Sequence, residues 1–122
     1  MRSLLGGDEM NRSLAIAVAH DGLSQPGGDN RGFPLEPLLH LLLDAEAPPT
    51  RLLFYTEGVR WVTRNSPLLD LLRAVEARGV ELVACRTCLR SAGLLEQVAV
   101  GKVSSQDGII EAMHAADNVV VL

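Results

Sequence analysis

Two cysteines separated by two residues are the side chains of this sequence best suited to chemistry. They form the segment Cys85-Arg86-Thr87-Cys88. A cysteine reacts as its thiolate, and a helix N-terminus or a nearby positive charge favours that anion. Cys85 directly follows an apolar run typical of a buried strand, and Arg86 and Arg90 carry positive charge close by. We therefore expect both sulfurs on one face of a turn, with the Cys85 sulfur exposed and largely deprotonated near neutral pH.

Other roles for the thiol pair stay open at this point. The two thiols can pack as small apolar groups, or they can exchange disulfides as in thioredoxin-like oxidoreductases, although that motif follows the first strand of its fold and not the third. A structural zinc site needs four ligands. The sequence has no second Cys-x-x-Cys, so zinc would have to recruit His20, His40 or His114. We predict no bound metal and no cofactor, with the three histidines lying mostly at the surface or in turns.

The elements that must position the thiols alternate between short apolar runs and amphipathic segments. Strands are expected at 14–19, 52–55, 80–84, about 98–103 and 118–122. Helices are expected from Pro34 or Pro37 to about residue 43, from Ser66-Pro67 to Gly79, after Ser91, and from Ser104 or Ser105 through Met113. This β-α alternation predicts a single α/β domain at 14–122 with a parallel sheet and helices on both faces. Residues 1–13 show no periodicity and are expected to be a frayed leader.

Functional residues of such sheets gather where the strands end. Three segments qualify, at 20–32, 56–65 and 85–91. The first contains a glycine-rich stretch at 27–32 that matches no phosphate-binding motif, so we expect a loop there. His20 and Asp21 are expected to form a hydrogen-bonded turn pair, or else to protonate a leaving thiol. Trp61 is expected in a subunit contact, or else in a pocket wall.

Composition and charge narrow the choice of partners. The net charge is −4, and the eleven lysines and arginines are scattered, which argues against nucleic acid. No apolar stretch reaches the roughly 20 residues that cross a bilayer, and the first residues do not resemble a secretory signal. We therefore expect a cytoplasmic protein with reduced thiols. The leucines at 38–43 surround their predicted helix almost completely, so we expect that helix to be apolar all round and largely buried. So apolar a helix also favours a homo-oligomer.

Several stretches, taken in order, resemble the DsrE-like family (DsrE/DsrF sulfur-relay type), and most closely the C-terminal domain of YedF-type sulfurtransferase-like proteins. These stretches are Phe54-Tyr55-Thr56-Glu57-Gly58-Val59-Arg60, 72–82, Cys85-Arg86-Thr87-Cys88-Leu89, 100–104 and 116–120. The resemblance implies a three-layer α/β/α domain, with a mostly parallel sheet of about five strands, that assembles into trimers or hexamers.

The resemblance also implies a sulfur-relay function through a cysteine persulfide. In the family pattern Gly-Val-x-Leu-x-x-Cys the carrier position falls on Cys85, and Cys88 then becomes the resolving thiol. Arg86 stands where that group usually has glycine. No sulfur-carrier domain fits before residue 14, so the donor or acceptor is expected to be a separate protein with a reactive thiol. Whether the protein is an enzyme stays open. The alternatives are a non-catalytic oligomeric binding module of the same fold and a thiol-disulfide redox protein.

Overall fold

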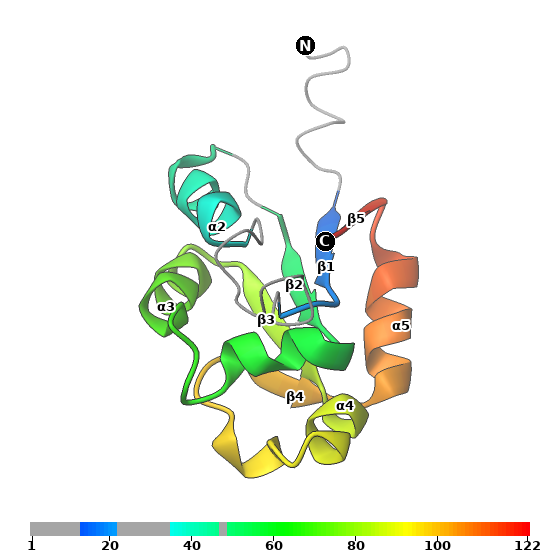
Figure 1. The fold of residues 1–122 in the computed structure, drawn as a ribbon. Coiled ribbons are helices and arrows are strands. Elements are labelled where there is room, and N and C mark those ends of the chain that lie inside the picture. The colour runs from blue at the N-terminus through cyan, green and yellow to red at the C-terminus, as the bar shows by residue number, and fades with distance from the viewer. Residues whose placement is uncertain (1–12, 22–34, 47–48) are drawn as a thin grey trace.

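A five-stranded parallel sheet forms the centre of the protein in a computed structural model that describes residues 13–21, 35–46 and 49–122 (Figure 1). The strands are β1 (Leu14–Val18), β2 (Arg51–Phe54), β3 (Glu81–Cys85), β4 (Lys102–Ser104) and β5 (Asn118–Val121). They lie in the order β4-β3-β2-β1-β5, and every neighbouring pair is parallel. The predicted sheet is confirmed, and it is parallel throughout.

Helices cover both faces of the sheet. The helical elements are α2 (Leu35–Asp44), the 3-10 helix η1 (Thr56–Val62), α3 (Leu69–Ala77), α4 (Arg86–Ser91), the 3-10 helix η2 (Leu95–Gln97) and α5 (Gln106–Ala115). The chain steps from β1 to β4 in one direction and returns across the whole sheet to β5. Right-handed crossovers therefore place α2 and α3 on one face and α5 on the other, as Figure 1 shows. The three-layer α/β/α prediction is confirmed.

The core is mostly aliphatic, with Phe54 and Trp61 also buried in it, and it lies on the faces of β1, β2 and β3. From α2, Leu35, Leu39 and Leu42 are buried against it, whereas Leu41 is 69% exposed. The expectation that this helix is apolar all round and largely buried is therefore wrong. An outer-layer helix can bury only the stripe that faces the sheet.

Local signals explain how several elements begin. The Ser105 hydroxyl accepts a hydrogen bond from the Gly108 N–H at 3.0 Å, so Ser105 caps α5 as predicted. The Ser66 hydroxyl accepts from the Leu68 N–H at 3.2 Å just before α3. Serine side chains satisfy backbone donors that the first helical turn leaves unpaired.

Two segments next to the thiols differ from the prediction. After α4, which begins at Arg86 within the thiol pair, the segment expected to form a short helix contains only the 3-10 helix η2. The expected loop at 56–65 contains the helix η1. The glycine-rich stretch at 27–32 and nearly all of the predicted leader lie outside the described residues. Within the described part of the chain, no helix is long and apolar enough to cross a membrane.

Candidate active site at the carboxyl end of the sheet

The carboxyl ends of β1, β2 and β3 lie side by side. Val18 pairs with Phe54, and Phe54 pairs with Ala84, so the three strands end at the same level. The residues that follow them are therefore neighbours: Ala19 to Asp21 after β1, η1 after β2, and α4 after β3. η1 and α4 are in contact with each other. This register brings the three predicted segments together, as far as the structure describes them.

Cys85 is the last residue of β3 and is almost fully buried, with 1% of its surface exposed. It belongs to the hydrophobic core, because β3 lies inside the sheet between β2 and β4. The expectation that the Cys85 sulfur is exposed is therefore wrong. Although Cys85 is the last residue of its strand, the interior position of β3 in the sheet keeps its side chain buried.

Cys88 lies in α4 and is partly exposed. It lines an open hollow at the carboxyl end of the sheet, together with side chains from both α4 and η1. The other residues of this thiol hollow are Thr56, Glu57, Arg60, Thr87, Ser91 and Ala92. The sulfur that a partner can reach is therefore that of Cys88.

The surroundings of Cys88 have opposing effects on the pKa of its thiol. Burial raises the pKa of the Cys88 thiol, and a hydrogen bond with Cys85 raises it further, while a hydrogen bond from the Thr56 backbone N–H lowers it. The net direction is upward, so Cys88 is mainly a thiol near neutral pH. Arg86 and Arg90 are exposed on α4, and the shift of the Cys88 pKa is caused by other groups.

The wall opposite Cys88 is held by contacts between η1 and the end of β1. The Thr56 hydroxyl donates to the carbonyl oxygen of Ala19, and the Gly58 N–H donates to the same oxygen at 3.2 Å. A Cβ on Gly58 would lie 2.0 Å from the carbonyl oxygen of Val18, so only glycine fits this approach.

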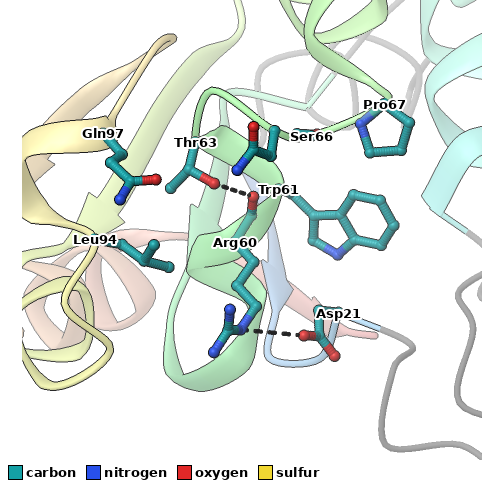
Figure 2. Close-up of a pocket in the computed structure, with 9 residues that line it drawn as sticks. Asp21, Arg60, Trp61, Thr63, Ser66, Pro67, Leu94 and Gln97 are labelled. Atoms are coloured by element: carbon teal, nitrogen blue, oxygen red, sulfur yellow. Dashed lines mark hydrogen bonds and ion pairs between the residues drawn. The ribbon is translucent and has the colours of Figure 1, made fainter.

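Figure 2 shows a second pocket, which shares Arg60 with the thiol hollow. The Arg60 Nε lies 3.3 Å from Oδ2 of Asp21, whose side chain is 7% exposed. The Trp61 ring is buried in the wall of this pocket, and its Nε1–H donates to the carbonyl oxygen of His20 at 2.8 Å. Trp61 therefore lines a pocket, the second of the two roles expected for it.

His20 and Asp21 each face a side chain of η1. The Nδ1 atom of His20 lies 3.7 Å from Oε1 of Glu57, and Asp21 pairs with Arg60. These contacts with η1, which the sequence did not predict, tie the end of β1 to the wall of the thiol hollow. His40 and His114 are exposed on their helices, as expected. Among the described residues, no group of three or more His, Cys, Asp or Glu side chains is placed to hold a metal ion.

A sequence model of the DsrE/DsrF-like family matches residues 13–122. The chain belongs to the DsrE/DsrF-like family. Membership suggests a function of the sulfur-relay type. No protein with a curated description matches the chain.

Solved structures show the same fold. The ychN protein from E. coli superposes with a TM-score of 0.67 at 18% identity, over 91% of this chain and 99% of that chain. MTH1491 from Methanobacterium thermoautotrophicum, a protein of unknown function, gives a TM-score of 0.68 at 19% identity, over 92% of this chain and 100% of that chain. At these identities the similarity establishes the DsrE-like fold and nothing about activity.

The sequence identified the thiol pair of this DsrE/DsrF-like domain but not the residues across from it. Thr56 and Arg60 line the thiol hollow, and both stand in the stretch 54–60 that carries the family resemblance. Gly58 was a usable signal, because a glycine shortly after a strand can mark a close backbone approach. Nothing in the sequence pointed to Thr56.

Proposed function

We propose that this DsrE/DsrF-like domain relays sulfane sulfur as a cysteine persulfide, with Cys88 as the acceptor and Cys85 as the resolving thiol. The observation that carries the proposal is the contrast between the two sulfurs. Cys88 lines the open thiol hollow, whereas Cys85 is hydrogen-bonded to it from inside the core. This order reverses the one that the family pattern implies.

The transfer step needs a thiolate and a persulfide donor, R–S–SH. The Cys88 thiol first gives up its proton, and its thiolate attacks the outer sulfur of the donor. The S–S bond of the donor breaks, its electron pair leaves on R–S⁻, and Cys88 becomes a persulfide. An acceptor thiolate then attacks the outer sulfur of that persulfide and restores the Cys88 thiolate. Both steps are thiol–disulfide-type exchanges.

Cys85 offers a second outcome for a loaded Cys88. If the Cys85 thiolate attacks the inner sulfur of the persulfide, hydrosulfide leaves and a Cys85–Cys88 disulfide remains. A dithiol reductant then restores the pair. Because Cys85 is buried, it can react only with a sulfur that is already next to it, such as that of Cys88. This arrangement confines the resolving reaction to the protein itself.

The thiol hollow suits a partner with an accessible thiol. Its α4 side includes the small side chains of Ser91 and Ala92, which leave room for an approaching group. We propose that the donor and acceptor are protein thiols in the cytoplasm and that the domain works as a homo-oligomer. Exposed Leu41 and Val119 to Val121 supply apolar surface for subunit contacts. We also propose that, within the family, the chain is most closely related to the C-terminal domain of YedF-type proteins.

Intact-mass spectrometry after incubation with a small-molecule persulfide donor tests the function. The reduced protein should gain one sulfur atom, Cys88→Ser should gain none, and Cys85→Ser should gain one and hold it longer because resolution is lost. Uptake that survives in Cys88→Ser but disappears in folded Cys85→Ser would restore the order implied by the family. No uptake in the wild type would refute the relay.

Thiol-disulfide exchange is a second candidate, because the hydrogen bond between Cys88 and Cys85 brings the two thiols together. It predicts a Cys85–Cys88 disulfide that forms with disulfide substrates, without any uptake of sulfur from a persulfide donor. The same mass measurement therefore separates the two functions.

A further inference from the structure

The backbone of Thr56 is the most unusual feature beside the thiols. Within the described residues it is the single non-glycine residue with a left-handed backbone, at φ 49°. Threonine is branched at Cβ, and such residues rarely adopt this conformation because Cβ crowds the following carbonyl. Specific contacts must therefore hold Thr56 in place.

The Thr56 hydroxyl supplies those contacts. It donates to the carbonyl oxygen of Ala19 at the end of β1 and lies 2.7 Å from the carbonyl oxygen of Tyr55. The Gly58 N–H donates to the same Ala19 oxygen, and its missing side chain lets η1 approach β1 closely. The side chain of Thr56 thus anchors its own backbone to the end of the neighbouring strand.

This anchored backbone faces the accessible sulfur. Thr56 and Cys88 both line the thiol hollow, one from η1 and one from α4. The Thr56 backbone N–H acts on the Cys88 sulfur as a hydrogen-bond donor and lowers its pKa. We propose that the Thr56 hydroxyl is a positioning group, which holds the left-handed backbone so that its N–H stabilises the anion formed on Cys88.

The proposal rests on the relay proposed above and explains how a mainly protonated Cys88 can react. A donor fixed in advance stabilises a developing anion without reorganisation. It helps first when the Cys88 thiol loses its proton, and again when an acceptor removes the sulfur and the thiolate returns. It also opposes the burial and the Cys85 hydrogen bond, which both raise the pKa of Cys88.

Substitutions at Thr56 separate the hydroxyl from the backbone that it holds. Thr56→Val removes both hydroxyl contacts and keeps the branched Cβ, so the backbone should leave the left-handed region. Thr56→Gly also removes the hydroxyl, but glycine adopts that region without strain. Thr56→Ala removes the hydroxyl and keeps an unbranched Cβ, so its backbone preference lies between those of valine and glycine. It takes the place of Thr56→Val in the comparison if the valine variant does not fold.

Thr50→Val is the matched control. The Thr50 hydroxyl donates to the carbonyl oxygen of Leu14 at 3.0 Å, at the opposite end of β1. Thr50 precedes β2 and Thr56 follows it, so the same chemical change is made at either end of one strand. Thermal unfolding of each variant checks that it is folded.

The measurement is the rate of Cys88 alkylation by iodoacetamide against pH. Trypsin cleaves after Arg86, so Cys85 and Cys88 fall on different peptides and are read separately. At pH 7.5 we expect Thr56→Val to be alkylated about tenfold more slowly, with its pH profile shifted about one unit upward, since a hydrogen bond to an anion is lost. Thr56→Gly should stay within about threefold of wild type, because its backbone needs no anchor.

Two results would overturn the proposal. One is a folded Thr56→Val, or Thr56→Ala, with the profile of wild type and Thr50→Val. The other is a Thr56→Gly variant as slow as Thr56→Val, which would assign the effect to the hydroxyl itself. Alkylation does not require sulfur transfer. If the wild type takes up no sulfur but the order of the variants holds, the relay fails and the positioning role stands.

Discussion

The two ends of the sheet are built from opposite kinds of chemistry. At the amino end, Glu81 of β3 lies 2.7 Å from Nε of Arg51 at the start of β2 and 2.6 Å from Nζ of Lys102 at the start of β4. These contacts lower the pKa of the Glu81 carboxyl, the Lys102 hydrogen bond most strongly. The fold thus stabilises the ionised carboxylate of Glu81, and its two ion pairs join the adjacent strands β2, β3 and β4.

At the carboxyl end the fold stabilises the uncharged form. Burial raises the pKa of Cys88, and a non-glycine residue is held in a left-handed conformation next to it. A titratable side chain with a shifted pKa and a residue with a strained backbone, both beside an open hollow, are typical of functional sites. The comparison teaches that charge alone does not locate function in this protein. The ionic cluster at the amino end is structural, and we place the chemistry at the end where the thiol of Cys88 is held uncharged.

The largest effect that would sharpen this contrast is the pH dependence of Cys88 alkylation. Since its pKa is raised, the thiolate fraction should increase about tenfold per pH unit below that pKa, hence about a hundredfold from pH 6.5 to pH 8.5. The rate should not level off near pH 8.5, the ordinary value for cysteine. Stopped alkylation followed by peptide mass analysis measures this. A plateau below pH 8 would mean a lowered pKa and would break the comparison.

A pair of glycine substitutions compares the two ends directly and should have the next largest effect. Gly58→Ala places a Cβ against the carbonyl oxygen of Val18 at the carboxyl end. We expect a loss of about 2 kcal/mol in the free energy of unfolding, as for other overpacked sites. Because η1 must move, the alkylation profile of Cys88 should change as well. Urea denaturation and alkylation provide the two readouts.

Gly79→Ala is its control at the amino end. Gly79 precedes β3 with φ 93°, and an added Cβ would meet nothing within 4 Å. The strained backbone should cost about 1 kcal/mol, with no effect on Cys88 alkylation. An altered alkylation profile in Gly79→Ala would show that the two ends are coupled.

The sequence predicted the amino-to-carboxyl order of the elements well, because apolar runs such as 14–19 and the Ser105 cap are local signals. It also identified Cys85 and Cys88 from their spacing. It failed on the exposure of Cys85 and did not indicate the raised pKa of Cys88, since both depend on contacts across the sheet. Burial of Cys85 follows from the place of β3 inside the strand order, and the approach of Thr56 to Cys88 joins residues far apart in the chain. No local pattern contains such distances.

The smallest predicted effect concerns the ionic cluster at the amino end. Glu81→Gln keeps the shape of the side chain and removes its charge, so the ion pairs with Arg51 and Lys102 are lost. The Glu81 side chain is 37% exposed, so solvent screening limits the loss in unfolding free energy to about 1 kcal/mol. Glu96→Gln, an exposed glutamate in η2, is the control and should change stability very little.

The pH dependence of that loss tests its cause. The folded pKa of Glu81 lies below its ordinary value of 4.5, so the unfolded chain binds the proton more readily. The stabilisation is therefore fully present above pH 4.5 and is lost as the pH falls through the lower folded pKa. Wild type and Glu81→Gln should converge in stability under acid and in high salt, where screening weakens the pairs. A difference that persists in both conditions would mean that the cluster acts through packing. The contrast between a carboxylate held charged at one end and a thiol held uncharged at the other would then lose its physical basis.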